Sequence, residues 1–110
     1  MKIFNTFLFF IFLNYYHTQN FTISGNIKDV GNGEDLIGAN IKIKENLNLS
    51  TTSNVYGFYS LSLQKGEYNI IYNYIGYETV TIKIIVDRDI KKNIDLESKS
   101  HILNEVEVTT

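Results

Sequence analysis

The sequence predicts an all-β fold, an antiparallel sandwich of six or seven short strands, and three observations lead to this prediction. From Phe21 onward, apolar residues recur at every second position, which is the period of half-buried strands. Breaks rich in Gly and Asn separate these runs at intervals of about 8–12 residues, as in sandwiches. No stretch keeps a 3.6-residue apolar repeat over three turns, so a helical domain is not expected.

The expected strands follow one another along residues 21–96, and each contributes alternate apolar side chains to the core. These side chains are Phe21, Ile23 and Ile27; Ile37, Ala39, Ile41 and Ile43; Tyr59, Leu61 and Leu63; Tyr68, Ile70, Tyr72 and Tyr74; Val80, Ile82, Ile84 and Val86; and Ile90, Ile94 and Leu96. Breaks are expected at residues 31–33, 46–54 and 65–66 and at Gly76, because Gly and Asn suit tight turns. The lysines expected to face outward and to discourage edge-to-edge pairing are Lys42, Lys44, Lys83, Lys91 and Lys92.

The first twenty residues differ from the rest and predict a secretory signal peptide. Lys2 supplies one positive charge, and five of the seven phenylalanines follow within the first twelve positions. A short apolar region after a positive charge is typical of a signal peptide, whereas a membrane-spanning helix needs about 20 apolar residues. We therefore expect residues 1–20 to be removed, with cleavage between Tyr16 and Asn20, and the remaining chain to be exported.

The composition argues against several classes of function. The chain has 10 Lys and Arg against 12 Asp and Glu, so the clustered positive charge that binds nucleic acid is not expected. It has no cysteine, which excludes disulfides, thiol nucleophiles and thiolate metal sites. Histidine occurs only at His17 and His101. We expect no enzymatic activity and no cofactor.

Two kinds of residue could still bind a ligand. Acidic turns at residues 34–35 and 87–89 offer oxygen atoms, but neither has the spaced acidic and amide side chains of a calcium loop, so no metal site is predicted. Tyr56 and Tyr77 lie in expected turns, and exposed aromatic rings there are candidates for stacking against a sugar. A module that binds carbohydrate or protein is therefore one interpretation of the chain.

The C-terminal residues 103–110 alternate again and have high strand propensity. One interpretation is a last edge strand of the same sandwich. The other is an extended segment that adds to the edge of a partner's sheet, where main-chain hydrogen bonds supply the affinity. On the residues alone, both interpretations stay open.

Five motifs resemble the carboxypeptidase regulatory-like domain, and the resemblance covers residues 21 to about 97. The motifs lie, in order, at residues 23–27, 36–41, 52–61, 66–68 and 74–78. The resemblance implies a seven-stranded, Ig-like or transthyretin-like β-sandwich. Such domains stand behind a signal peptide at the N-terminus of many TonB-dependent outer-membrane receptors, including the SusC-like glycan importers of Bacteroidetes. There they lie in the periplasm, ahead of the plug and the barrel.

The same resemblance implies that residues 98–110 form a linker with a segment similar to a TonB box. The residues that would pair with the edge of the C-terminal sheet of TonB are Glu105, Val106, Glu107, Val108 and Thr109. We therefore expect the N-terminal extension of a TonB-dependent receptor, as a fragment or truncated product, on the periplasmic side of the outer membrane. It would meet the membrane only through a barrel that this chain lacks, and would dock or relay a signal by strand addition. The alternative is a stand-alone secreted or periplasmic module that binds carbohydrate or protein.

Overall fold

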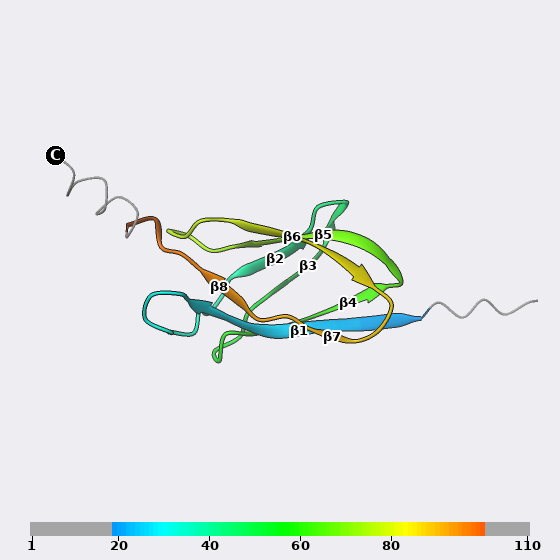
Figure 1. Ribbon diagram of the computed structural model, residues 1–110, viewed down its shortest axis with the longest axis horizontal. Coiled ribbons are helices and arrows are strands. Elements are labelled where there is room, and N and C mark those ends of the chain that lie inside the picture. Colours follow the sequence, from blue (N-terminus) through cyan, green and yellow to red (C-terminus); the bar gives the residue numbers. More distant parts are fainter. Residues whose placement is uncertain (1–18, 101–110) are drawn as a thin grey trace, which may run out of the picture.

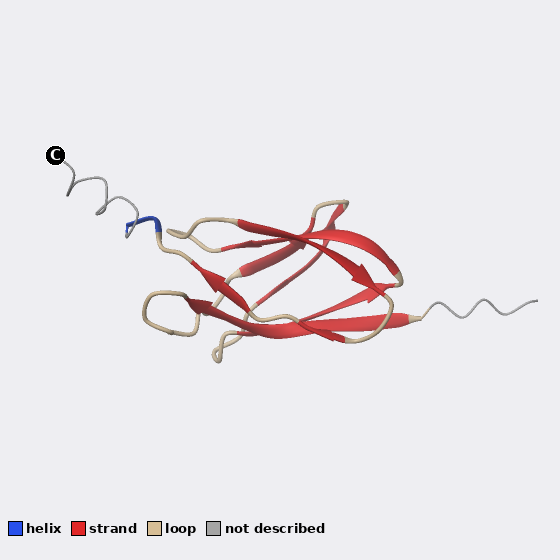
Figure 2. Cartoon of the chain, in the orientation of Figure 1, coloured by secondary structure: helices blue, strands red, loops and turns tan. Residues whose placement is uncertain are grey.

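Two β-sheets pack face to face in the computed structural model, which describes residues 19–100 (Figures 1 and 2). The strands are β1 (Asn20–Asp29), β2 (Asn40–Ile43), β3 (Asn46–Thr52), β4 (Phe58–Gln64), β5 (Gly66–Asn73), β6 (Val80–Val86), β7 (Ile90–Lys91) and β8 (Ile94–Leu96). One sheet has the order β4-β1-β7, with β8 also paired to β1, and the other has the order β3-β2-β5-β6. The predicted all-β sandwich is confirmed. Among residues 19–100, no helix is long and apolar enough to cross a membrane.

The prediction of a purely antiparallel sandwich is wrong for one edge of the first sheet. The second sheet is antiparallel throughout, and β1 is antiparallel to β4. However, β1 is parallel to both β7 and β8. The chain crosses from β6 in the second sheet to β7 in the first, and a crossover between sheets allows the parallel pairing that a tight hairpin cannot form.

Residues 19–100 form eight strands rather than the six or seven expected, because two local differences each add one strand to the six apolar runs. Both β7 and β8 lie along β1, β7 beside Ile23 and Ser24 and β8 beside residues 27–29, with a break between them. A further strand, β3, occupies residues 46–52, where a turn was expected. Leu47 and Leu49 alternate with asparagines, but both side chains are exposed, and the stretch is rich in the Asn and Ser residues that favour turns. Pairing with β2 holds it in the strand conformation.

The predicted apolar alternation is confirmed for most of the core. The predicted side chains that are buried are Ile23, Ile27, Ala39, Ile41, Ile43, Tyr59, Leu61, Leu63, Ile70, Tyr72, Val86, Ile94 and Leu96. The prediction is wrong for Ile37, whose side chain is 52% exposed, whereas the neighbouring Leu36 is buried. Gly38 has a φ of 80° and β2 begins only at Asn40, so the strand alternation does not extend back to Ile37.

A close approach at Gly25 separates β7 from β8. A Cβ atom on Gly25 would lie 2.0 Å from the carbonyl oxygen of Lys92. The Lys92 N–H donates to the Ser24 carbonyl at 2.7 Å, and the Asn93 side chain accepts the Asn26 N–H at 3.0 Å. Residues 92–93 therefore press against β1 at a point where only a residue without a side chain fits.

Two tyrosines form a hydrogen-bonded chain in the core, next to that break. The Tyr59 hydroxyl donates to the Lys92 carbonyl at 2.7 Å, so the Tyr72 hydroxyl is the donor in the 2.8 Å bond between the two phenols. Their rings meet edge to face, with centroids 5.4 Å apart. Burial raises the pKa of both hydroxyls, which keeps them protonated and able to donate.

Candidate partner-docking site

The chain leaves the sandwich at one end, called here the exit end. It is formed by residues 29–32 at the end of β1, the turn 74–78 between β5 and β6, and residues 97–100 after β8 (Figure 1). Three backbone hydrogen bonds join these stretches: Val30 N–H to Leu96 C=O at 2.9 Å, Glu78 N–H to Glu97 C=O at 2.8 Å, and Lys99 N–H to Gly76 C=O at 2.9 Å. The chain is therefore fixed in position as far as Lys99.

Asp29 connects the loops of the exit end. It continues the inward-facing positions of β1 and is only 8% exposed. One carboxylate oxygen accepts the Gly31 and Asn32 N–H groups at 2.6 and 3.2 Å, and the other accepts the Tyr77 hydroxyl at 2.6 Å. The bond to the carboxylate favours the protonated phenol and, together with partial burial, raises the pKa of Tyr77 to about 12.

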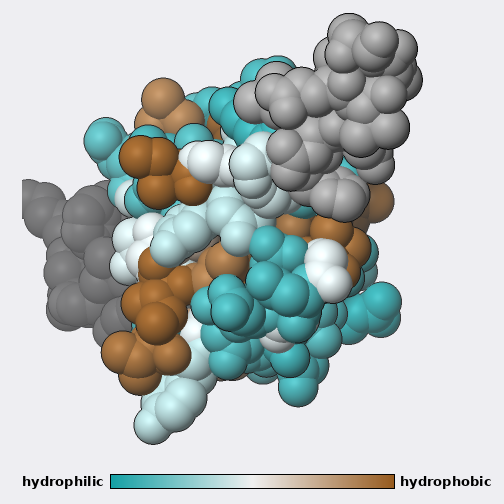
Figure 3. All heavy atoms as spheres, turned by 90° about the vertical axis from the view of Figure 1, so that its left-hand side faces the viewer, coloured by the Kyte–Doolittle hydropathy of each residue, from teal (hydrophilic) through white to brown (hydrophobic). Residues whose placement is uncertain are grey.

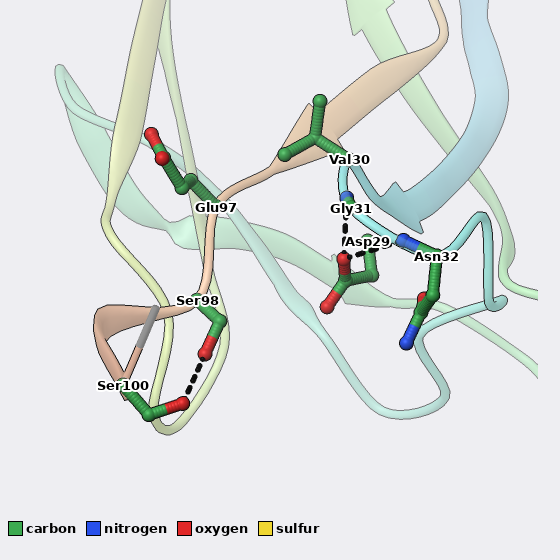
Figure 4. A pocket seen from close by; sticks show the side chains of 7 residues that line it. All are labelled: Asp29, Val30, Gly31, Asn32, Glu97, Ser98 and Ser100. Atoms are coloured by element: carbon green, nitrogen blue, oxygen red, sulfur yellow. Dashed lines mark hydrogen bonds between the residues drawn. The ribbon is translucent and has the colours of Figure 1, made fainter. Parts of the chain in front are cut away.

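An open hollow of about 460 Å³ lies at the exit end (Figure 4). Its lining residues are Asp29, Val30, Gly31, Asn32, Glu97, Ser98 and Ser100. The hydroxyls of Ser98 and Ser100 are hydrogen-bonded to each other at 2.8 Å. Within residues 19–100 no group of three or more His, Asp or Glu residues could hold a metal ion. The hollow therefore offers hydrogen-bonding groups next to the point where the chain leaves the sandwich.

The surface at the exit end is mixed in polarity. Figure 3 views this end directly and shows separate apolar clusters beside hydrophilic residues. Two large apolar side chains of the exit-end loops, Val30 and Ile75, are exposed. Such a surface can support contacts with a partner.

The two tyrosines predicted as sugar-stacking residues lie in different loops. Tyr56 precedes β4, and its side chain is 72% exposed. Tyr77 is half-buried at the exit end, where its ring packs 5.4 Å from that of Tyr74 and its hydroxyl is bonded to Asp29. Only Tyr56 therefore presents an open ring, and the fold does not join the two into one platform.

The acidic turn residues fasten loops to β1. Asp89 accepts the Thr22 N–H at 2.8 Å, and Asp35 lies 4.0 Å from the Lys28 ammonium group. The residues predicted to resemble a TonB box, at positions 105–109, lie outside the described residues. Asp29 is not among the predicted site residues, although two features mark it: it follows the inward positions of β1 and it precedes a Gly-rich turn.

A family model described as the CarboxypepD_reg-like domain matches residues 23–108, which includes the whole sandwich after the first residues of β1. The chain belongs to this family. The resemblance on which the sequence analysis relied is thus confirmed for the domain. A search of curated proteins found no match.

Two solved structures resemble this CarboxypepD_reg-like domain in fold. The backbone protein of pilus 2b from group B streptococcus has 14% sequence identity and a TM-score of 0.56, with 74% of this chain and 42% of that chain covered. The TIE protein of Bacillus anthracis has 18% identity and a TM-score of 0.58, with 72% and 17% covered. The chain thus spans less than half the length of either protein, and at this identity the likeness concerns the fold alone.

Proposed function

We propose that this CarboxypepD_reg-like domain is an exported, non-enzymatic docking module, the N-terminal extension of a TonB-dependent receptor on the periplasmic side of the outer membrane. The observation that carries the proposal is the exit end. There the backbone is held by hydrogen bonds through Lys99, and the alternating segment 103–109 begins three residues after Ser100. A segment that starts from a fixed point is presented to a partner in a defined place.

The proposed mechanism is strand addition to the C-terminal sheet of TonB. Main-chain N–H and C=O groups of residues 105–109 extend the partner's sheet, while the alternating Glu and Val side chains set the register. A pull on the segment reaches the domain first at the Lys99–Gly76 and Glu78–Glu97 hydrogen bonds. The plug and barrel of the receptor are the further partners in this proposal.

One observation favours a second function, a stand-alone binding module for carbohydrate or protein. Tyr56 is largely exposed, and Val55 beside it is exposed as well. An aromatic ring with an apolar neighbour can stack against a sugar. Chemical-shift changes at Tyr56 on addition of oligosaccharides would support this function, and their absence across a broad panel would remove it.

The docking proposal is tested by deleting residues 103–110 and measuring binding to a purified TonB C-terminal domain. We expect the deletion to abolish binding while the circular dichroism spectrum of the sandwich is kept, because residues 19–100 contain all eight described strands. Equal binding by the full chain and the deletion variant would contradict the proposal.

Proline substitutions separate strand addition from a simple effect of length or charge. In an added strand, alternate residues direct their N–H groups to the partner, so at least one of Val106→Pro and Glu107→Pro should abolish binding. Val106→Thr keeps the N–H and the β-branched shape, so its dissociation constant should stay within about threefold of that of the unmodified chain. If both proline variants bound TonB as tightly as Val106→Thr does, the segment would not bind as a strand.

A further inference from the structure

The outer edge of β6 is open along its whole length. The Lys44 N–H donates to the Asn69 carbonyl, so Asn69 faces β2, and the alternate β5 residues Tyr68, Ile70 and Tyr72 face β6. Their partners on β6 are Ile84, Ile82 and Val80. It follows that Thr81, Lys83 and Ile85 direct their main-chain N–H and C=O groups outward, and within residues 19–100 nothing pairs with these groups.

This edge also leaves apolar surface uncovered. Val80, Ile82 and Ile84 pack against the core but are only half-buried, and Ile85 on the other face is 65% exposed. The edge strand β4 differs, because its inward residues Tyr59, Leu61 and Leu63 are already buried. An added strand would therefore bury much more apolar surface beside β6 than beside β4.

The other two edges are less suited to an added strand. The edge formed by β7 and β8 is interrupted at residues 92–93 and carries Lys91 and Lys92. The edge strand β3 pairs with β2 through a register shift between Lys42 and Ile43, and irregular edges resist further pairing. By contrast, β6 pairs with β5 in one continuous register over seven residues.

The described part of the chain ends close to the start of β6. Residues 97–99 are bonded to the turn 76–78, which ends two residues before β6 begins, and β6 runs from there away from the exit end (Figure 1). Lys99 and Ser100, at the end of the described residues, are helical (Figure 2). Extended chain covers about 3.3 Å per residue, so residues 101–109 reach about 30 Å, whereas β6 needs about 23 Å.

The side chains of that segment match the β6 edge in polarity and charge. When Val106 and Val108 lie on the face of Ile82 and Ile84, the alternate residues Glu105 and Glu107 fall on the opposite face, where Lys83 is exposed. The Lys83 ammonium group already attracts one carboxylate, that of Glu67 at 2.7 Å.

We propose that residues 103–109 dock as an added strand, parallel to β6, on the open edge of their own sandwich. The docked segment is stored there and must leave the edge before it can pair with another sheet. This inference concerns the segment that the proposed function uses, and it adds a regulation of that function.

Amide hydrogen exchange tests the docking without any partner protein. It is measured residue by residue on the full chain, as purified from the periplasm, and on a variant that ends at Ser100. In the full chain the amides of Thr81, Lys83 and Ile85 should exchange about tenfold more slowly. The outward-facing amides of Ser60 and Ser62 on β4 serve as the internal control and should exchange equally in both.

A charge exchange makes the test specific. Glu105→Lys with Glu107→Lys should remove the protection at β6, and adding Lys83→Glu to that variant should restore it. Equal exchange at β6 in the full and shortened chains would overturn the proposal. So would protection that grows with protein concentration, because the strand would then come from a second copy. No TonB is present, so this result and the binding result above can fail independently.

Discussion

Replacing Gly25 by alanine tests whether the break between β7 and β8 is set by the close approach of Lys92. The new Cβ would lie 2.0 Å from the Lys92 oxygen and 2.5 Å from its carbonyl carbon. Carbon and oxygen atoms without a covalent link stay about 3.3 Å or more apart. The strands must therefore separate by more than about 1 Å, since both partners are backbone and neither can rotate away.

The separation disturbs three hydrogen bonds, and their weakening sets the expected loss of stability. They are Lys92 N–H to Ser24 C=O at 2.7 Å, Asn26 N–H to the Asn93 side chain at 3.0 Å, and Tyr59 O–H to Lys92 C=O at 2.7 Å. Each hydrogen bond contributes about 0.5–1.5 kcal/mol to the free energy of unfolding. Alanine in place of glycine adds about 0.4–1 kcal/mol, because it restricts the unfolded chain. The free energy of unfolding should fall by about 2–3 kcal/mol.

Urea denaturation and thermal melting measure this change. For a domain of this size the melting temperature should fall by about 10–20 °C. Gly66→Ala is the matched control, because the atoms nearest to a Cβ there belong to the Tyr68 side chain, at 3.4 Å or more, and it should change stability by less than about 0.5 kcal/mol. If Gly25→Ala behaved like Gly66→Ala, the close approach of Lys92 would not be a constraint on the fold.

Two further predictions concern tyrosine hydroxyls. Tyr77→Phe removes the bond to Asp29 and should lower stability by about 1–2 kcal/mol. Because the folded pKa of Tyr77 is raised to about 12 from 10.0, its contribution is present below pH 10 and lost as pH rises through 12. Denaturation at pH 9 and pH 12 should therefore show a smaller difference between wild type and Tyr77→Phe at the higher pH; a constant difference would contradict the assignment. In the core, Tyr59→Phe should cost about 2–3 kcal/mol, because it leaves the Lys92 carbonyl and the Tyr72 hydroxyl without this partner, whereas Tyr72→Phe should cost about 1 kcal/mol. The double variant Tyr59→Phe with Tyr72→Phe should be no less stable than Tyr59→Phe alone. If the stability losses of the two single variants simply added in the double variant, the Tyr72 hydroxyl would not be the donor to the Tyr59 hydroxyl.

Apolar alternation predicted the core well because it reports burial directly. Strands with one buried face have an apolar residue at every second position, as β4 has at Tyr59, Leu61 and Leu63. The edge strand β3 has almost no buried face, and its short alternation at Leu47 and Leu49 lies in an Asn-rich stretch that predicts a turn equally well. Ile37 was predicted to be buried but is exposed. The apolar alternation of the sequence continues through Gly38, whereas the backbone turns there.

The parallel pairing of β1 with β7 and β8 was not predictable from alternation, because parallel and antiparallel neighbours give the same period. One residue did carry a signal. In β1 the inward positions Ile23 and Ile27 flank Gly25, and glycine within a strand often marks a close backbone approach. Asp29, the next inward position, likewise marks the strand end where loops need a buried acceptor.

The two proposals for residues 103–109 are linked by one equilibrium. An alternating Glu and Val strand fits any open sheet edge of matching charge, so the β6 edge and the edge of TonB compete for the same main-chain groups. About tenfold protection at β6 means that about one tenth of the chains have a free segment, and the apparent affinity for TonB is lower by the same factor. A partner's sheet must therefore bind the segment more tightly than the β6 edge does. This competition is modest because a parallel strand pair is slightly less stable per residue than an antiparallel pair.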